Sequence, residues 1–268
     1  MKTKIISCLL FILMCAVACE EVEYTQEAAD IPVVESFLVP GQAPVVKITR
    51  IIPYAAEEAD TVAVPISGIE VVLTINGLDH NLAEDSAGSG LYTLTDNTVF
   101  VKPGDSVSLS AEYKGTILTA TTVVPTAPAN LALSDDVLYY TMGDPSTWLS
   151  AGEIELSWDN PEEDFYYITV TNIETNPVAL NEMAVDMPTF ASSSPSTGDQ
   201  FRIGMRNVTY FGTHQVIIYH VNHEFAELFD NPGMSSVGLT EPPTNVTNGL
   251  GIFTAMYPDT VYFEVRTN

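Results

Sequence analysis

The stretch Val107-Ser108-Leu109-Ser110-Ala111-Glu112-Tyr113 carries apolar residues at its odd positions and Ser or Glu between them. Side chains of a β-strand point alternately to its two faces, so this alternation predicts a strand with one buried face. The turn signal Lys114-Gly115 comes next, followed by residues 117–124, which are rich in Thr and Val. Two such runs with a turn between them are typical of an antiparallel β-protein.

Runs of the same kind recur along the chain between turn signals made of Gly, Pro, Asn and Asp. Residues 135–151 and 176–199 are polar segments that we expect to be loops, and 223–230 form the one helix candidate. Many short strands without a long amphipathic helix predict an all-β sandwich protein. The predicted strands are residues 31–39, 45–52, 69–75, 91–94, 107–113, 117–124, 153–158, 166–174, 201–206, 215–222 and 261–265.

A proline-bracketed linker, Pro125-Thr126-Ala127-Pro128, predicts the division of the chain into two domains. An N-terminal β-sandwich would span residues 31–125, and a C-terminal one residues 129–268. In the second half Trp158 ends a predicted strand and precedes a turn and the aromatic-rich residues 165–170. This resembles the fibronectin type III form of the immunoglobulin-like sandwich, which implies that Trp158 is buried between the sheets.

The first 19 residues have the features of a lipoprotein export signal. Residues 1–18 contain two early lysines, an apolar run and then small residues, and we expect them to be removed as a signal peptide. The apolar run is too short to span a membrane. Small residues directly before Cys19 resemble the bacterial lipobox, although Ala16 stands where that motif favours Leu. Cys19 is therefore the predicted lipidation site, modified with acyl chains such as palmitate. The alternative is an ordinary signal peptide with a non-functional Cys.

Removal of the leader would leave Cys19 as the only cysteine, so we expect no disulfide within the mature chain. Residues 19–30 form an acidic tether with three early glutamates. The tether resembles the acidic export signals that send some bacterial lipoproteins to the cell surface; a plain solvated linker is the alternative. The first predicted partner is thus the lipid of the outer membrane, reached through acylated Cys19.

Composition excludes several classes of function. The formal net charge is −26, from 9 Lys and Arg against 35 Asp and Glu, and this excludes nucleic acid because phosphate binding needs basic side chains. With 46% hydrophobic and 16% charged residues, most of the chain cannot be intrinsically disordered. Phosphate loops, dinucleotide fingerprints and nucleophile elbows do not occur, so we predict no catalytic residue and no cofactor.

Three histidines, His214, His220 and His223, have a spacing that would suit zinc if their side chains converged. Hydrogen-bonded or solvated histidines are the favoured alternative, and no metal site is predicted. The acidic runs 135–136 and 162–164 lack the alternating pattern that a calcium loop requires.

Two further sets of residues are candidates for modification or binding. In the first set, each Ser or Thr follows Asp and precedes a small apolar residue, as in the O-glycosylation motif of some Gram-negative bacteria. Asp-Ser and Asp-Thr pairs also form turns, which is the alternative. The members of this set are Thr61, Ser86, Ser106 and Thr260. The second is a set of aromatic residues in or beside predicted loops, whose rings would stack on sugars or peptides or else plug the sandwich ends. Its members are Tyr139, Tyr140, Trp148, Tyr210, Phe211 and Tyr257.

Several segments in order are similar to the bacterial envelope lipoprotein family known as domain of unknown function 4249. These segments are residues 33–38, 46–50, 65–71, 90–92, 118–125 and 245–253. The family usually has Gly where Ser36 stands here. The resemblance implies a Gram-negative envelope lipoprotein of β-sandwich domains, often encoded near TonB-dependent outer-membrane receptors, and with no established activity.

Together these features predict a lipid-anchored outer-membrane lipoprotein that acts without catalysis as an accessory binding module. A TonB-dependent receptor is its expected protein partner through the family resemblance alone. A structural or adhesive surface protein is the first alternative. An envelope hydrolase is the second, and would require a pocket that holds a histidine or a carboxylate pair.

Overall fold

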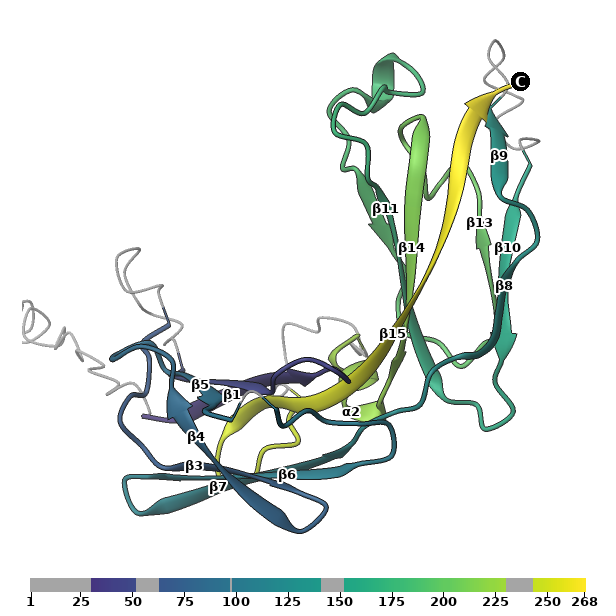
Figure 1. The fold of residues 1–268 in the computed structure, drawn as a ribbon. Coiled ribbons are helices and arrows are strands. Elements are labelled where there is room, and N and C mark those ends of the chain that lie inside the picture. The colour runs from purple at the N-terminus through teal and green to yellow at the C-terminus, as the bar shows by residue number, and fades with distance from the viewer. Residues whose placement is uncertain (1–29, 52–62, 97, 141–151, 230–242) are drawn as a thin grey trace, which may run out of the picture.

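The computed structural model describes residues 30–51, 63–96, 98–140, 152–229 and 243–268. These residues form strands and a few very short helices, so the protein is all-β, as the sequence predicts (Figure 1). In these ranges no helix has the length and apolar character needed to cross a bilayer. The predicted leader (residues 1–18), Cys19, Thr61 and Trp148 lie outside the described residues.

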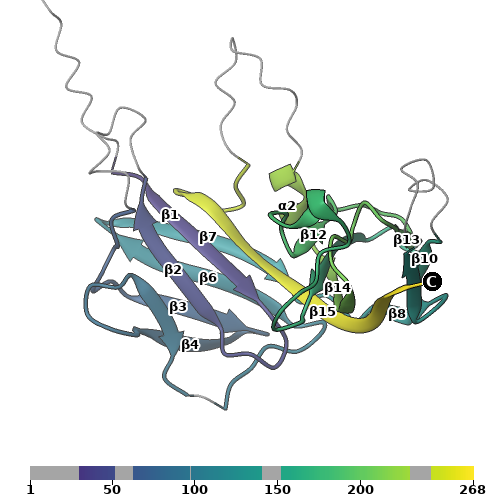
Figure 2. The ribbon, with the colours of Figure 1, turned by 90° about the horizontal axis from the view of Figure 1, so that it is seen from above.

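The first half of the chain forms one sheet that folds over on itself. Its strands are β1 (Pro32–Leu38), β2 (Val45–Arg50), β3 (Val71–Ile75), β4 (Leu78–Glu84), β5 (Leu91–Leu94), β6 (Ser106–Tyr113) and β7 (Thr116–Val123). They pair in the order β1-β2-β5-β4-β3-β6-β7. Figure 2 shows β1 and β2 lying over β6 and β7. Thr119 of β7 and Thr247 exchange two backbone hydrogen bonds of 2.8 and 3.3 Å, which join the two layers at one side.

The alternation in β6 places its apolar side chains between the layers, as predicted. Val107, Leu109 and Ala111 are buried, and the serines between them are only partly covered. They belong to one hydrophobic core with Val34 and Ile48 from the opposite layer. Burial of apolar area at roughly 25 cal/mol per Å² is the main force that holds the layers together.

Strand β4 is not among the predicted strands, although the sequence Asn76-Gly77 before it is a turn signal. Asn76 and Gly77 both have positive φ, 50° and 83°, as a two-residue hairpin turn of the primed type requires. This turn folds β4 back onto β3. In β4 only Leu82 is buried, and Leu78 is 68% exposed, so the strand carries no alternating pattern from which to predict it.

The second half forms a two-sheet sandwich. Its elements are β8 (Ala129–Leu133), β9 (Val137–Tyr140), β10 (Ile154–Asp159), β11 (Phe165–Asn172), η3 (Glu182–Ala184), β12 (Phe190–Ser192), β13 (Gln200–Ile203), β14 (Gly212–Val221), α2 (His223–Ala226), η4 (Glu227–Phe229) and β15 (Leu250–Thr267). One sheet has the order β13-β10-β8, and the other has β12-β11-β14-β15 with β9 alongside β15. This division of strands is that of a fibronectin type III-like, immunoglobulin-like sandwich.

Trp158 lies in the core between these sheets, which confirms its predicted place. It is 4% exposed and packs on Tyr166 at a ring-centroid distance of 5.2 Å. Leu156 and Ile168 from the two facing sheets belong to the same core. The predicted short helix is also confirmed, as α2 followed directly by η4.

The predicted boundary between the domains is wrong for the end of the chain, because strand β15 belongs to both sandwiches. Its first residues pair in parallel with β1, from Val33 opposite Leu250 to Leu38 opposite Ala255. Its later residues pair with β14 up to Val265. Val246, Phe253 and Ala255 are buried in the first core, so residues 246–255 belong to the first unit rather than to a domain 129–268. A parallel pairing between strands from opposite ends of the chain cannot be recognised from nearby residues, whereas a proline-rich linker can.

Other differences concern short strands. β8 was not predicted, β9 lies in the expected loop 135–151, and β12 lies in the expected loop 176–199. β9 adds only a short parallel stretch to the end of β15, and β12 adds three residues at the sheet edge. Such short edge strands carry too few residues for a period to be visible.

The two units meet at an elbow (Figure 1). Polar side chains there bind the end of β7 to the start of α2. Asn222 donates hydrogen bonds of 2.8 Å to the hydroxyl of Thr122 and to the carbonyl of Val123. Glu224 accepts hydrogen bonds from the hydroxyls of Thr122, at 2.7 Å, and Thr254, at 3.1 Å. With β15 running through it, the elbow is held by both backbone and side-chain contacts.

Candidate functional site

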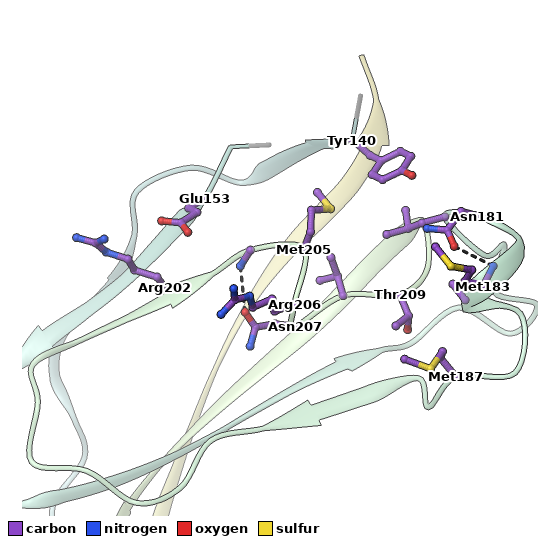
Figure 3. A pocket seen from close by; sticks show the side chains of 14 residues that line it. Tyr140, Glu153, Asn181, Met183, Met187, Arg202, Met205, Arg206, Asn207 and Thr209 are labelled. Carbon is purple, nitrogen blue, oxygen red and sulfur yellow. Dashed lines mark hydrogen bonds between the residues drawn. The ribbon is translucent and has the colours of Figure 1, made fainter. Parts of the chain in front are cut away.

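A groove of about 770 Å³ opens at the end of the second sandwich that lies away from the elbow. That volume lies in the range of sites that hold small ligands or peptide side chains, roughly 300–1,000 Å³. In Figure 3, Glu153 and Arg202 lie at one end, Met205 and Arg206 in the middle, and the methionines of the η3 segment at the other end. The described lining residues are Tyr140, Glu153, Leu180, Asn181, Met183, Ala184, Met187, Arg202, Gly204, Met205, Arg206, Asn207, Val208 and Thr209.

The wall that contains η3 is held in place by hydrogen bonds to its backbone. Asn181 caps η3, its side-chain oxygen accepting from the backbone N–H of Met183 at 3.0 Å. The Tyr210 hydroxyl reaches the carbonyls of Val185, at 3.2 Å, and Met187, at 2.8 Å. The buried Tyr210 therefore fixes the segment after η3 through its hydroxyl, although this segment forms no long helix or strand.

A tight turn after β13 forms the middle of the groove. The Asn207 side-chain oxygen accepts from the Gly204 N–H at 3.1 Å, and the Asn207 N–H donates to the Gly204 carbonyl at 2.9 Å. The sequence predicts a strand through residue 206, but β13 ends at Ile203. The turn brings Met205 and Arg206 to the groove instead of continuing the sheet.

Methionine side chains dominate the apolar part of the groove. Of the four methionines in the described residues, Met183, Met187 and Met205 line it, and Met256 does not. Met183 and Met187 are 76% and 52% exposed. Unbranched thioether side chains adapt their shape to different apolar partners, which suits a binding surface.

The polar part of the groove is rich in hydrogen-bond donors. Arg202 and Arg206 both line it, and after residue 129 the only other basic residue is Arg266. Arg202 approaches the carboxylate of Glu155 at 3.9 Å, with both side chains largely exposed to solvent. The groove thus has two guanidinium groups and one lining carboxylate, that of Glu153, in a chain of net charge −26.

The predicted aromatic residues divide into two groups. Tyr140 and Tyr210 are buried, and the ring of Tyr140 packs edge-to-face on Phe211 at 5.7 Å, so these three rings close the sandwich end rather than stand free. Tyr140 nevertheless lines the groove. Tyr139 is exposed, and Tyr257 is half-buried in β15. Of the two alternatives for these rings, Tyr140, Tyr210 and Phe211 fit the end plugs rather than free stacking platforms.

The histidines have separate environments. His214 is buried, stacks on Phe263 and shares a 3.0 Å contact with the Gly212 carbonyl. Burial lowers the pKa of the His214 imidazole, so it is neutral in the folded protein at pH 7.

His220 stacks on Tyr166 and contacts the Thr126 carbonyl at 2.8 Å and Asp164 at 3.3 Å. Burial raises the pKa of Tyr166 to about 12. Exposed His223 pairs with Glu227 at 3.3 Å. The described part of the chain contains no cluster of three His, Cys, Asp or Glu that could hold a metal ion.

The sites suggested for glycosylation differ in access. Ser86 and Ser106 are exposed, at a turn and at the first residue of β6 respectively. Thr260 lies inside β15, opposite Ile217, and is half-buried. Its place in a strand interior makes it a poorer acceptor than the two serines, and whether any of these residues is glycosylated stays a prediction.

The sequence alone does not predict the groove, because its residues come from loops and from a strand end. Met183, Met187, Arg202 and Arg206 lie in or just beyond segments with no period, and nothing local marks them as neighbours. The one local indication of a binding site is that Arg202 and Arg206, two of the three arginines after residue 129, lie within five residues of sequence.

Comparisons with known proteins give little beyond the fold. No protein-family model matches the chain, and no curated protein matches it. The chain is similar to the solved FN1–FN3 domains of chicken CNTN1, at 13% identity and a TM-score of 0.26, over 87% of this chain and 65% of that one. Because that TM-score is low, the fibronectin type III-like assignment rests on the strand order. The resemblance to domain of unknown function 4249 stays a prediction.

Proposed function

We propose that this protein is a lipid-anchored outer-membrane lipoprotein of the family known as domain of unknown function 4249, acting as a non-enzymatic accessory module of a TonB-dependent transport system. The observation that carries the binding role is the methionine- and arginine-lined groove at the end of the second sandwich. The lipoprotein and transporter parts of the proposal are supported by the lipobox-like leader and the family resemblance.

The position of the groove suits an anchored protein. Asp30, the last residue of the tether and the first described residue, is bound by Lys114, by the Tyr113 hydroxyl at 2.9 Å and by Arg50 at 3.9 Å. Hydrogen bonds from Lys114 and Tyr113 lower the pKa of the Asp30 carboxyl, so it stays ionised. These contacts attach the end of the tether to the first sandwich, next to the start of β1.

Strand β15 runs from this end of the molecule, through the bend at the elbow, to the groove (Figure 1). Its first residue, Leu250, pairs beside the start of β1, and its last, Thr267, pairs with Tyr140 of the groove wall. Its 18 residues rise about 3.3 Å each, roughly 55 Å along the strand. A lipid on Cys19 would thus hold one end of the molecule, and the groove would face a partner at the other.

The lining chemistry favours binding over catalysis. The described lining residues include no His, Cys or Ser, and Glu153 is their one carboxylate. The Thr209 hydroxyl donates to the Pro188 carbonyl at 2.9 Å and is held as a structural group. General acid–base or nucleophilic catalysis needs a paired or activated group, which these residues do not form.

A structural or adhesive role is a second candidate, favoured by the elbow. A shared 18-residue strand and the bonds of Asn222 and Glu224 stiffen the junction between the two sandwiches. A stiff stalk would need this junction, whereas the groove would be incidental to it.

Affinity purification of the intact lipoprotein from native outer membranes tests the proposal, with mass spectrometry of the Cys19 peptide and of the co-purifying proteins. We expect an acylated Cys19 and a stoichiometric TonB-dependent receptor. Met187→Asp in the groove should release the receptor, and Leu78→Asp, an exposed apolar position on the first sandwich, is the matched control. A lone acylated protein would contradict the accessory role and favour the stalk, and an unmodified Cys19 would contradict the anchor.

A further inference from the structure

Exposed apolar side chains extend beyond the groove along the segment that contains η3, and we call them its rim. Val178, Met183, Val185, Met187 and Phe190 all lie in one segment and are 52–76% exposed. Several exposed apolar side chains in one segment are typical of interaction surfaces in soluble proteins, because water contact with them is unfavourable. A small molecule inside the groove would leave most of this rim in water, so the rim indicates a larger occupant.

The charge at the groove restricts what that occupant carries. Arg202 and Arg206 line the groove with one carboxylate, that of Glu153, and Arg202 also lies 3.9 Å from Glu155, so Arg206 is the guanidinium group with no ion pair among the described residues. Guanidinium groups form strong, directional hydrogen bonds with carboxylates. Asn181 and Asn207 also line the groove, and each of their side-chain oxygens already accepts a backbone N–H, which leaves the amide N–H₂ groups as donors.

From this combination we infer that the groove and its rim bind a segment of a partner protein that presents large apolar side chains together with at least one carboxylate. The inference rests on the proposed binding function and specifies the chemistry of its partner. The methionines accept the apolar side chains, whose shape they follow, and the two arginines accept the Asp or Glu. The open rim suits a polypeptide segment, whereas a free fatty acid needs an enclosed pocket to remove its chain from water.

A displayed library of random peptides, panned against the acylated protein in nanodiscs, tests this inference. We expect enrichment of peptides that combine an acidic residue with large apolar residues. Replacing the carboxylate of an enriched peptide by the amide should weaken its binding about tenfold to a hundredfold, the value of a charge-assisted hydrogen bond.

Charge reversal gives the sharpest control. In the double variant Arg202→Glu and Arg206→Glu, the same library should yield basic rather than acidic apolar peptides. Arg266→Glu changes the third arginine of this region, which does not line the groove, and should leave the enriched peptides unchanged. Met183→Ser with Met187→Ser should abolish enrichment of apolar residues while the protein keeps its circular dichroism spectrum.

Several outcomes would overturn the inference. These are enriched peptides without carboxylates, unchanged selection by the double arginine variant, and the absence of any enrichment. Arg206-dependent binding of palmitate with no peptide enrichment would assign the groove to a free amphiphile instead. Co-purification of a receptor that persists in all groove variants would leave the accessory function standing and show that the partner docks elsewhere, so the two proposals fail separately.

Discussion

Gly251 offers a direct test of the shared strand. It lies in β15 opposite Val34 of β1, with φ of +100°, a conformation that side chains with a Cβ rarely adopt. A Cβ built on Gly251 would come within 2.0 Å of the Val34 carbonyl oxygen, a backbone atom that cannot move without shifting β1. Gly251→Ala therefore forces either the strand pairing or the backbone of β15 to change.

The magnitude follows from two separate costs. Placing alanine at positive φ costs about 1–2 kcal/mol, and overpacking against a fixed neighbour adds about 1–3 kcal/mol. Gly41→Ala is the matched control, because Gly41 also has positive φ, +77°, but no atom within 4 Å of a built Cβ. We expect Gly251→Ala to lower the free energy of unfolding by about 2–5 kcal/mol and Gly41→Ala by only the first of these costs.

The free energy of unfolding of both variants is measured by urea denaturation. The transition is followed by circular dichroism and by Trp158 fluorescence, in a Trp148→Phe background. Circular dichroism reports both sandwiches, and Trp158 reports the second core. If β15 couples the units, the Trp158 transition should shift with Gly251→Ala although Gly251 pairs with the first unit. Equal effects of the two glycine variants would refute the close approach, and an unshifted Trp158 transition would refute the coupling.

Three further predictions concern the core, the elbow and the groove. Because burial lowers the pKa of His214, the unfolded chain takes up a proton near pH 6.5 that the folded protein does not. Stability should therefore fall as pH drops below about 6.5, until the folded imidazole itself titrates, and denaturation of His214→Gln between pH 7 and pH 5 should show a shallower loss. Asn222→Ala removes two hydrogen bonds across the elbow and should cost about 1–3 kcal/mol in urea denaturation, and an unchanged midpoint would show that the elbow does not depend on them. Tyr210→Phe removes the hydroxyl that holds the Val185 and Met187 carbonyls; it should cost about 1–2 kcal/mol and speed hydrogen exchange after η3, whereas unchanged exchange would show that backbone packing alone positions this wall.

Much of the secondary structure was predictable because sandwich strands bury one face. β6, β7 and β5 were predicted at or near their observed bounds, since their apolar residues alternate or cluster between turn signals. The place of Trp158 followed from its position before a turn and an aromatic strand. β4, β9 and β12 lacked such patterns, because each is short or contributes few buried side chains.

The sequence by itself determined the all-β class and the buried strand faces, because both depend on residues close together in the chain; the export and lipidation signals, which are just as local, stay predictions. Only the tertiary structure decided that β15 completes both sandwiches, since its pairing with β1 joins residues more than 200 positions apart. The same holds for the groove. Tyr140, Met183 and Arg206 become neighbours only when the sandwich closes, and side chains in loops acquire a common surface from packing rather than from any local period.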